Sequence, residues 1–135
     1  MSVPVLVATA EREVYRGDAD FLVAPGAAGE LGIMPNHAPL LSALKPGELR
    51  VHVGDHIDEV FISGGFIEVQ PNMITILADS AERATDIDEA AALEATRKAE
   101  DGEANRNGDI DYARASSELA IAAARLDWLR KKKRH

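Results

Sequence analysis

The pattern of apolar residues changes abruptly near Asp86, and this change constrains the fold more than any other feature of the sequence. Before it, short stretches alternate apolar and polar residues or are β-branched, as in residues 3–7, 49–53 and 73–77. After it, glycine and proline give way to alanine and charged residues. Period-two alternation is typical of strands, and a spacing of three to four residues is typical of helices. The sequence therefore predicts an α+β chain, with an all-β domain over residues 1–84 and an α-helical domain over residues 85–135.

Glycine and proline divide the first domain into short segments. Turn signals at residues 16–18, 25–26, 46–47, 54–55 and 71–72 separate the expected strands. Strands this short, with such turns between them, predict a β-sandwich or a barrel. Gly64 and Gly65 interrupt the apolar stretch 60–69, which predicts a bulge or the close approach of another backbone.

The second domain is predicted to be an antiparallel two-helix hairpin. Asp86 is the expected N-cap of a first helix running from Ile87 to about Glu100, with Glu89 completing a capping-box-like pair. A second helix is expected after Asp109, ending in basic residues that oppose the helix macrodipole. A short connection between two helices makes them antiparallel neighbours.

Two apolar stripes are expected on the second helix. The first comprises Ile110, Ala113, Ser117, Ala120, Ile121, Ala124 and Trp128, and the second comprises Leu119, Ala122, Leu126 and Leu129. Four of these eleven residues are alanine, which buries little area, so at about 25 cal/mol per Å² the adhesion of this face is modest. This composition suggests the hypothesis that the hairpin can rest against the β-domain or leave it.

Charge and composition exclude several classes of protein. The net charge of −8 argues against a general nucleic-acid binder. Five of the 15 basic residues stand in the run Arg130–Arg134, a candidate contact for an acidic surface. The chain has no cysteine, which excludes disulfides, thiolate zinc sites and cysteine catalysis. We see neither a signal peptide at the N-terminus nor a run of about 18 apolar residues, so any membrane role is expected to be peripheral.

Few side chains have the spacing of a catalytic or metal site. His52, His56 and Asp58 flank the turn at 54–55 and are in principle a metal clamp, but histidines facing solvent are commoner in hairpins. Glu30 and His37 are a conceivable acid–base pair, without a suitably placed nucleophile. No GxxxxGK[ST] stretch is present. The residue pattern alone therefore predicts an interaction protein, with no catalytic residues and no bound metal.

The stretch Glu30–Leu40 reads ELGIMPNHAPL, and Ser63–Val69 reads SGGFIEV. Both stretches resemble signature motifs of the epsilon subunit of bacterial F-type ATP synthases, called delta in mitochondria. Residues 75–79, 81–84, 86–88 and 109–115 follow in the family's order, so the resemblance covers essentially the whole chain. It implies a β-sandwich followed by a helical hairpin.

The resemblance also implies a place and partners. The chain is expected in the central rotor stalk, bound to the gamma subunit and to the membrane ring of c subunits, at the cytoplasmic face of the cell membrane and peripheral to it. Its ring-contacting positions would be Glu30, Leu31, Gly32, Ile33, Met34 and His37. When the hairpin extends, Arg130, Lys131, Lys132, Lys133 and Arg134 would meet the alpha and beta subunits of the catalytic head and inhibit hydrolysis. The sequence does not distinguish proton from sodium coupling.

Some members of the family bind ATP in the hairpin, and the corresponding positions here match only in part. The matching residues are Glu82, Ile87, Asp88 and Arg125. Alanine stands at 91 and isoleucine at 121, where the pattern has arginine. Losing two cations around a triphosphate removes charge-assisted bonds of roughly 1.5–3 kcal/mol each. Weak or absent ATP binding is therefore expected, and no cofactor.

Two other functions compete with the rotor subunit. A free-standing ATP-sensing adaptor with a hairpin switch would need the missing arginines at 91 and 121. A small β-sandwich enzyme using Glu30 and His37 would need a nucleophile, a metal set or a phosphate loop.

Overall fold

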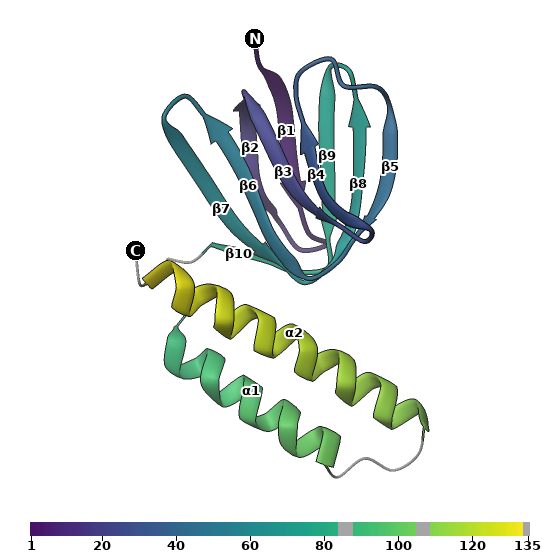
Figure 1. Cartoon of the computed structure of the whole chain (residues 1–135), viewed down its shortest axis with the longest axis vertical. Helices are drawn as coiled ribbons and strands as arrows, with labels where there is room; N and C mark the ends of the chain where they lie inside the picture. Colours follow the sequence, from purple (N-terminus) through teal and green to yellow (C-terminus); the bar gives the residue numbers. More distant parts are fainter. Residues whose placement is uncertain (84–87, 105–108, 134–135) are drawn as a thin grey trace. The chain divides into compact units, whose positions relative to one another are not determined.

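The computed structural model describes residues 1–83, 88–104 and 109–133 of the 135-residue chain. The chain divides into two compact units, Met1–Arg83 and Ala84–His135, and each is described by itself. The first, the β-unit, consists of strands, and the second, the helical unit, consists of two helices (Figure 1). The predicted fold class is confirmed.

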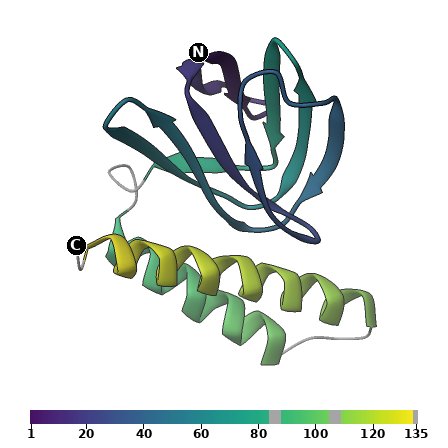
Figure 2. The same ribbon diagram turned by 45° about the horizontal axis from the view of Figure 1, so that its top comes forward.

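The β-unit contains ten strands. They are β1 (Val3–Ala8), β2 (Glu13–Ala19), β3 (Phe21–Gly26), β4 (Gly29–Ile33), β5 (Leu40–Leu44), β6 (Gly47–Val53), β7 (His56–Ile62), β8 (Gly65–Gln70), β9 (Met73–Ala78) and β10 (Ala81–Arg83). Hydrogen bonds join them in the order β10-β7-β6-β3-β5-β8-β9-β1-β2, and β4 pairs with β3. The sheet curls so that its two halves face each other as a nearly closed sandwich (Figures 1 and 2).

Aliphatic side chains fill the space between the two halves. Along β1, Val3, Val5 and Val7 are buried while Pro4 between them is exposed, which is the alternation expected of a strand with one face on a core. The parallel pairing of β1 with β9 sets Val7 opposite Ile76. The core cluster contains Val, Ile, Leu and Ala side chains, with Tyr15 packed at its margin. Aliphatic packing therefore holds the β-unit together, as the low aromatic content predicts.

The turn predictions are partly confirmed. Residues 54–55 and 71–72 form turns, whereas Pro25 and Gly26 end strand β3 and the turn lies at 27–28. The predicted turn at 16–18 is wrong, because these residues lie inside β2, where Gly17 pairs with Val5. A Cβ on Gly17 would lie 3.1 Å from the Tyr15 hydroxyl oxygen. Glycine therefore makes room there for the tyrosine ring two residues away on the same face.

The helical unit is a hairpin of α1 (Glu89–Ala104) and α2 (Asp109–Lys133). The backbone N–H of Ala90 donates to Asp88 Oδ1 at 3.0 Å, so Asp88 is the N-cap of α1. Asp86 and Ile87 lie outside the described residues. The first helix thus begins two residues later than predicted and continues past Glu100 through Gly102.

The two helices pack antiparallel against each other. The Thr96 hydroxyl lies 3.1 Å from the Ala92 carbonyl oxygen of its own helix and 3.3 Å from the Ala122 carbonyl oxygen of α2. Arg130 Nε, near the end of α2, lies 3.3 Å from Glu89 Oε1 at the start of α1. On α2 the second predicted stripe is half-buried or buried, whereas Ala113, Ser117 and Ala120 of the first are exposed.

Candidate interaction surfaces

Strand β4 presents the first candidate surface. Glu30, Gly32 and Met34 are exposed and alternate along the chain, whereas Leu31 is half-buried against the core and Ile33 is fully buried. Successive side chains of a strand point to opposite faces, so the residues predicted to touch a ring divide into an outward set and an inward set. We call Glu30, Gly32 and Met34 the β4 surface. The Ile33 side chain serves the core of the β-unit.

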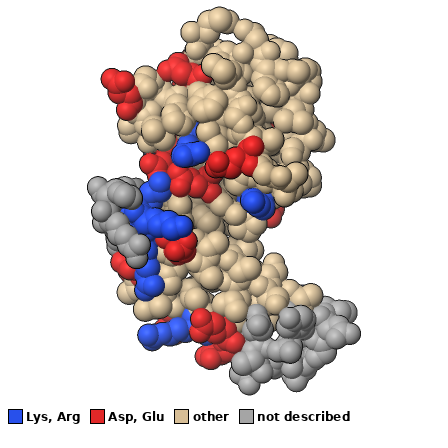
Figure 3. Space-filling model, viewed as in Figure 1, with Lys and Arg blue, Asp and Glu red and all other residues tan. Residues whose placement is uncertain are grey.

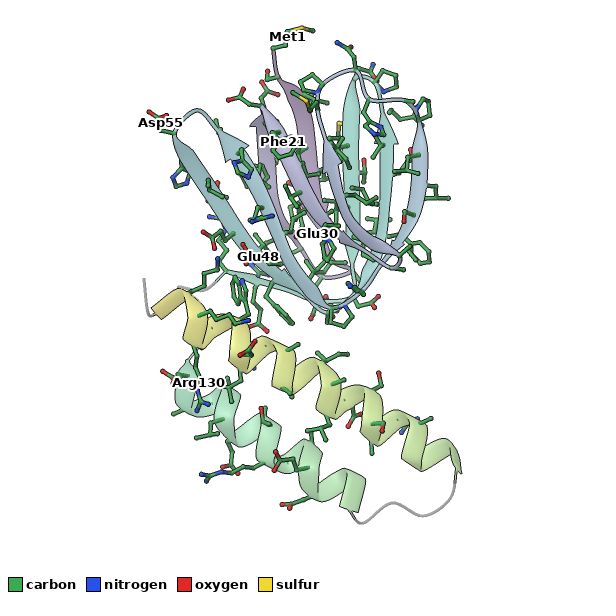
Figure 4. The ribbon with its side chains drawn as sticks, in the orientation of Figure 1. Met1, Phe21, Glu30, Glu48, Asp55 and Arg130 are labelled. Carbon is green, nitrogen blue, oxygen red and sulfur yellow. The ribbon has the colours of Figure 1, made fainter. Side chains whose placement is uncertain are left out.

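Charge on the β4 surface is already paired within the β-unit. Arg50 Nη2 on β6 donates to Glu30 Oε2 at 3.4 Å, and Arg50 Nε lies 4.0 Å from Glu48 Oε1. Figure 4 shows Glu30 and Glu48 at the same end of the β-unit, and Figure 3 shows both signs of charge together there. Because Glu30 is 68% exposed, this ion pair is worth less than about 1 kcal/mol and leaves the carboxylate accessible to another partner.

His37 lies in the loop that follows β4, apart from Glu30. Its backbone N–H donates to the Met34 carbonyl at 3.2 Å, and its ring Nδ1 lies 2.7 Å from the Ala38 carbonyl oxygen. Asn36, at φ 66°, donates its N–H to the Pro71 carbonyl at 3.2 Å, which ties the loop to the turn between β8 and β9. Within the described chain no hydrogen bond or ion pair joins Glu30 to His37, and each has its own partner. His37 therefore shapes the loop.

The outer face of β5, β8 and β9 is the second candidate surface, and sequence reasoning did not assign it. Leu41, Phe66 and Leu77 are 70%, 58% and 59% exposed. Phe66 lies directly opposite Leu77 on β9 and opposite Ala43 on β5, so these side chains form a row across three strands. We call Leu41, Ala43, Phe66 and Leu77 the apolar face. The sequence does contain a signal for this face. Phe66 and Leu77 each stand next to a buried isoleucine, Ile67 and Ile76, so in a strand they point to the opposite, outer face.

Exposed apolar side chains in a contiguous row point to a partner. Single exposed leucines are ordinary on protein surfaces, but a row containing an aromatic ring is typical of an interaction site. Phenylalanine and leucine here have no polar atoms that water would solvate. The apolar face can therefore bind another apolar surface by the hydrophobic effect.

The basic end of α2 is the third candidate surface. Arg130 pairs with Glu89, and Lys131 Nζ lies 3.0 Å from Asp127 Oδ2 one turn earlier. Lys132 is half-buried, the Lys133 side chain is not described, and Arg134 lies outside the described residues. We call Arg130, Lys131 and Lys132 the basic end. Arg130 and Lys131 already have carboxylate partners within the helical unit, so the outward charge of the basic end is smaller than the sequence suggests.

The residues considered for metal or ATP binding have other structural roles. His52 lies opposite Ile57 and Val53 lies opposite His56, so the two histidines point to opposite faces of the β6–β7 hairpin. The His52 ring lies 5.3 Å from that of Phe21, and His56 Nε2 lies 3.3 Å from Asp58 Oδ1. No group of three potential metal ligands occurs among the described residues.

Of the four partial matches for ATP, Asp88 already accepts the N-cap bond of α1. Glu82 lies in β10 and Arg125 is half-buried on α2, while Ile87 is outside the described part of the chain. Titration calorimetry with Mg-ATP is expected to give no binding in the micromolar range, because positions 91 and 121 lack cations. Micromolar affinity would overturn this expectation. A double variant with Ala91→Arg and Ile121→Arg is the matched test, and is expected to bind more tightly than the parent chain.

Comparisons with known proteins agree with this two-unit organisation. The family model described as the ATP synthase Delta/Epsilon chain, beta-sandwich domain, matches residues 2–84. The model described as the ATP synthase Delta/Epsilon chain, long alpha-helix domain, matches residues 85–129. Together the two models cover nearly all of the chain.

Curated relatives match over most of their length. The chain is 50% identical over 137 residues to the ATP synthase epsilon chain of Thioalkalivibrio sulfidiphilus, covering 100% of this chain and 97% of that one. It is 53% identical over 126 residues to the ATP synthase epsilon chain of Acidithiobacillus ferridurans, covering 93% and 89%.

Two solved structures share the fold. A chain of the Euglena gracilis mitochondrial ATP synthase matches with a TM-score of 0.80 at 20% identity, covering 95% of this chain and 81% of that chain. A chain of the Tetrahymena thermophila mitochondrial ATP synthase central stalk and c-ring matches with a TM-score of 0.62 at 16% identity, covering 93% and 97%.

Proposed function

The chain belongs to the delta/epsilon family of ATP synthase chains, as its sequence motifs predicted, and from that membership we propose that it is a non-catalytic subunit of the rotating central stalk. In this role it joins the c-subunit ring to the gamma subunit, so that rotation of the ring reaches the catalytic head. The observation that carries the proposal is the apolar face, which gives the β-unit a surface for a permanent partner.

The gamma subunit is the proposed partner of the apolar face. Phe66 lies in the middle of the row, flanked by Ala43 and Leu77 on the neighbouring strands. A central aromatic residue surrounded by smaller apolar ones is the usual arrangement of an interface hot spot. Torque transmission needs a contact that does not slip, and burial of these side chains on a rigid sheet provides one.

The c-subunit ring is the proposed partner of the β4 surface. Glu30 offers an exposed carboxylate from the outer face of β4, and Met34, directly after the strand, offers an exposed thioether side chain. Gly32 between them is exposed, and a Cβ at that position would lie 3.3 Å from the ring Cζ of Phe21, which flanks it. His37 holds the following loop rather than contributing a free imidazole. Through these contacts the chain is held at the cytoplasmic face of the cell membrane, and among the described residues no helix is both long and apolar enough to cross it.

The helical unit is the proposed regulator of ATP hydrolysis. Extended along gamma, α2 would bring the basic end to acidic segments of the alpha and beta subunits and block rotation in the hydrolytic direction. Positive charge on an otherwise acidic chain attracts only a negative partner.

Charge reversal of the basic end tests this regulatory role. A triple variant with Arg130→Glu, Lys131→Glu and Lys132→Glu is expected to inhibit hydrolysis less, with the largest difference from the parent chain at low salt, since screening weakens exposed charge interactions. The pairs of Arg130 with Glu89 and of Lys131 with Asp127 are largely open to water and worth less than about 1 kcal/mol each, so their loss costs the hairpin little. Rates of ATP hydrolysis at several ionic strengths measure the effect.

The matched control changes the same kind of residue on the other helix. Arg97→Glu with Lys98→Glu alters two exposed cations of α1 and is expected to leave inhibition unchanged. A triple variant that inhibits like the parent chain at every salt concentration would count against the basic end as the inhibitory contact.

Removal and replacement of the chain test the proposed function as a whole. An ATP synthase depleted of this chain is expected to hydrolyse ATP faster and to lose ATP synthesis driven by an ion gradient. Adding the chain back should slow hydrolysis and restore synthesis in the same vesicles. If neither rate responds to the chain, it is not a coupling subunit.

A further inference from the structure

The strand order leaves the sheet of the β-unit with two ends. Strand β10 stands at one end, paired with β7, and β2 stands at the other, paired with β1. Curling brings these ends toward each other, and a side chain of β10 reaches β2 across the seam. Arg83 Nη2 donates to the Val14 carbonyl oxygen at 3.3 Å.

Arg83 makes two further contacts at this seam. Its guanidinium carbon lies 5.9 Å from the centroid of the Tyr15 ring on β2, within the range of a cation–π interaction. Its Nη1 lies 3.9 Å from Asp58 Oδ1 on β7. One side chain thus touches a backbone carbonyl and an aromatic ring of one sheet end and a carboxylate near the other.

Partial burial strengthens the contacts of Arg83. Asp58 is only 23% exposed and Arg83 is 40% exposed, so water screens their attraction less than at an open surface. Tyr15 packs against the core, and burial, assisted by the charge of Asp58, raises the pKa of its phenol. A tyrosine phenol is uncharged at neutral pH, and the Arg83 guanidinium lies over the Tyr15 ring. His56 is the other group within reach of Asp58, at 3.3 Å, and is 71% exposed.

Arg83 also has a special place in the chain. It ends β10, a strand of three residues, and it is the last residue of the β-unit before the chain continues into the helical unit. A three-residue strand with a single ladder neighbour has few backbone hydrogen bonds of its own. Its attachment therefore depends strongly on side-chain contacts.

We propose that Arg83 is a positioning residue. Its contacts with Val14, Tyr15 and Asp58, which we call the clasp, join the two ends of the sheet and fix the point from which the helical unit leaves the β-unit. Without this clasp, β10 separates from β7 and its three residues join the connection to α1. At about 3.3 Å per residue, they lengthen that connection by on the order of 10 Å. The inference does not depend on the proposed function; within that function, the clasp would limit how far the helices reach.

Site-directed spin labelling tests the clasp, because a chain without cysteine accepts labels only at introduced sites. Labels at Asn72→Cys on the β-unit and Lys98→Cys on α1 use two exposed positions. In Arg83→Gln, the distribution of label distances is expected to broaden by on the order of 10 Å. Amide exchange in β10 should rise about tenfold or more, since a charged hydrogen bond and a cation–π contact are lost, while exchange in the core strands stays the same.

Arg16→Gln is the matched control. Arg16 lies on the same end strand β2, but it is exposed, and its ion-pair partner within the described residues is Glu13 on that strand, at 2.7 Å. It is expected to change neither the distances nor the exchange of β10. Asp58→Asn removes one partner of the clasp and should give a smaller change in the same direction, which keeps the test decisive should Arg83→Gln fail to fold.

The result that overturns the inference is an unchanged distance distribution. If the label distances stay as in the parent chain in Arg83→Gln, or in Asp58→Asn where Arg83→Gln does not fold, Arg83 does not position the helical unit. Faster exchange spread evenly over the β-unit with unchanged label distances would show that Arg83 only adds general stability, and would equally overturn the proposal.

Discussion

Gly65→Ala is expected to lower the free energy of unfolding of the β-unit by roughly 3 kcal/mol, a large part of the stability of an ordinary domain. Gly65 has φ +139°, a conformation that side chains other than glycine rarely adopt. A Cβ there would overlap the Leu77 carbonyl oxygen and lie 2.8 Å from the Ala78 Cα. Both are backbone atoms of the neighbouring strand β9, so relief requires the ladder between β8 and β9 to move.

Urea unfolding followed by circular dichroism measures this loss, with the slope m checked for an unchanged denatured state. Gly102→Ala is the control, because Gly102 lies in α1 and a Cβ there meets no atom within 4 Å. That substitution is expected to raise helix stability by about 0.5–1 kcal/mol. A Gly65→Ala chain within 1 kcal/mol of the parent would mean that β8 and β9 are less tightly apposed than the structure has them.

Phe66→Glu is expected to weaken binding of the chain to the gamma subunit by about a hundredfold or more, an effect of hot-spot size. The ring is 58% exposed in the free chain, so glutamate there has little effect on folding. In a complex it would carry a carboxylate into the centre of the apolar face, where burying an unpaired charge is costly. Calorimetric titration of gamma with the variant measures the loss.

Ile57→Glu is the matched control for Phe66→Glu. Ile57 is also an exposed apolar residue, at 42%, but it lies on β7 near the turn at 54–55 and outside the apolar face. Its substitution is expected to leave the affinity for gamma unchanged. If Phe66→Glu binds as tightly as Ile57→Glu, the apolar face is not the contact with gamma.

The strands were predictable where their periodicity was clear. Residues 3–7, 49–53 and 73–77 became β1, β6 and β9, because one buried face imposes alternation or a β-branched apolar run. The close backbone approach expected at Gly64 and Gly65 is confirmed by the contact that a Cβ on Gly65 would make with β9. At these positions the residues that the local pattern favours are also the residues that tertiary packing requires, so the sequence alone predicts the structure.

The turn and loop predictions were wrong where a glycine is required by tertiary packing and not by a turn. Gly17 signals a turn locally, yet it lies in β2 because the Tyr15 ring occupies the space above it. Residues 29–33 contain two glycines, which locally favour a loop, yet all five residues pair with β3 and form β4. No local pattern reports which side chain will cover a glycine.

The candidate surfaces were only partly predictable for a similar reason. The family resemblance implies one contact over Glu30 to Met34 with His37, but burial divides Glu30 to Met34 into the outward Glu30, Gly32 and Met34 and an inward pair. The row of Ala43, Phe66 and Leu77 depends on the pairing of β5 with β8, two strands that β6 and β7 separate in the sequence. The contact of Arg83 with Val14 and Tyr15 likewise joins residues about 70 positions apart.

The most direct test of the proposed place in the rotor is titration of the full-length chain into the purified gamma subunit, followed by calorimetry and by co-elution in size-exclusion chromatography. We predict a stable complex of one chain with one gamma subunit. Phe66→Glu should abolish or greatly weaken it, and the charge-reversed basic end should leave it unchanged. Absence of a complex between gamma and the parent chain would contradict the proposed place of this protein in the rotor.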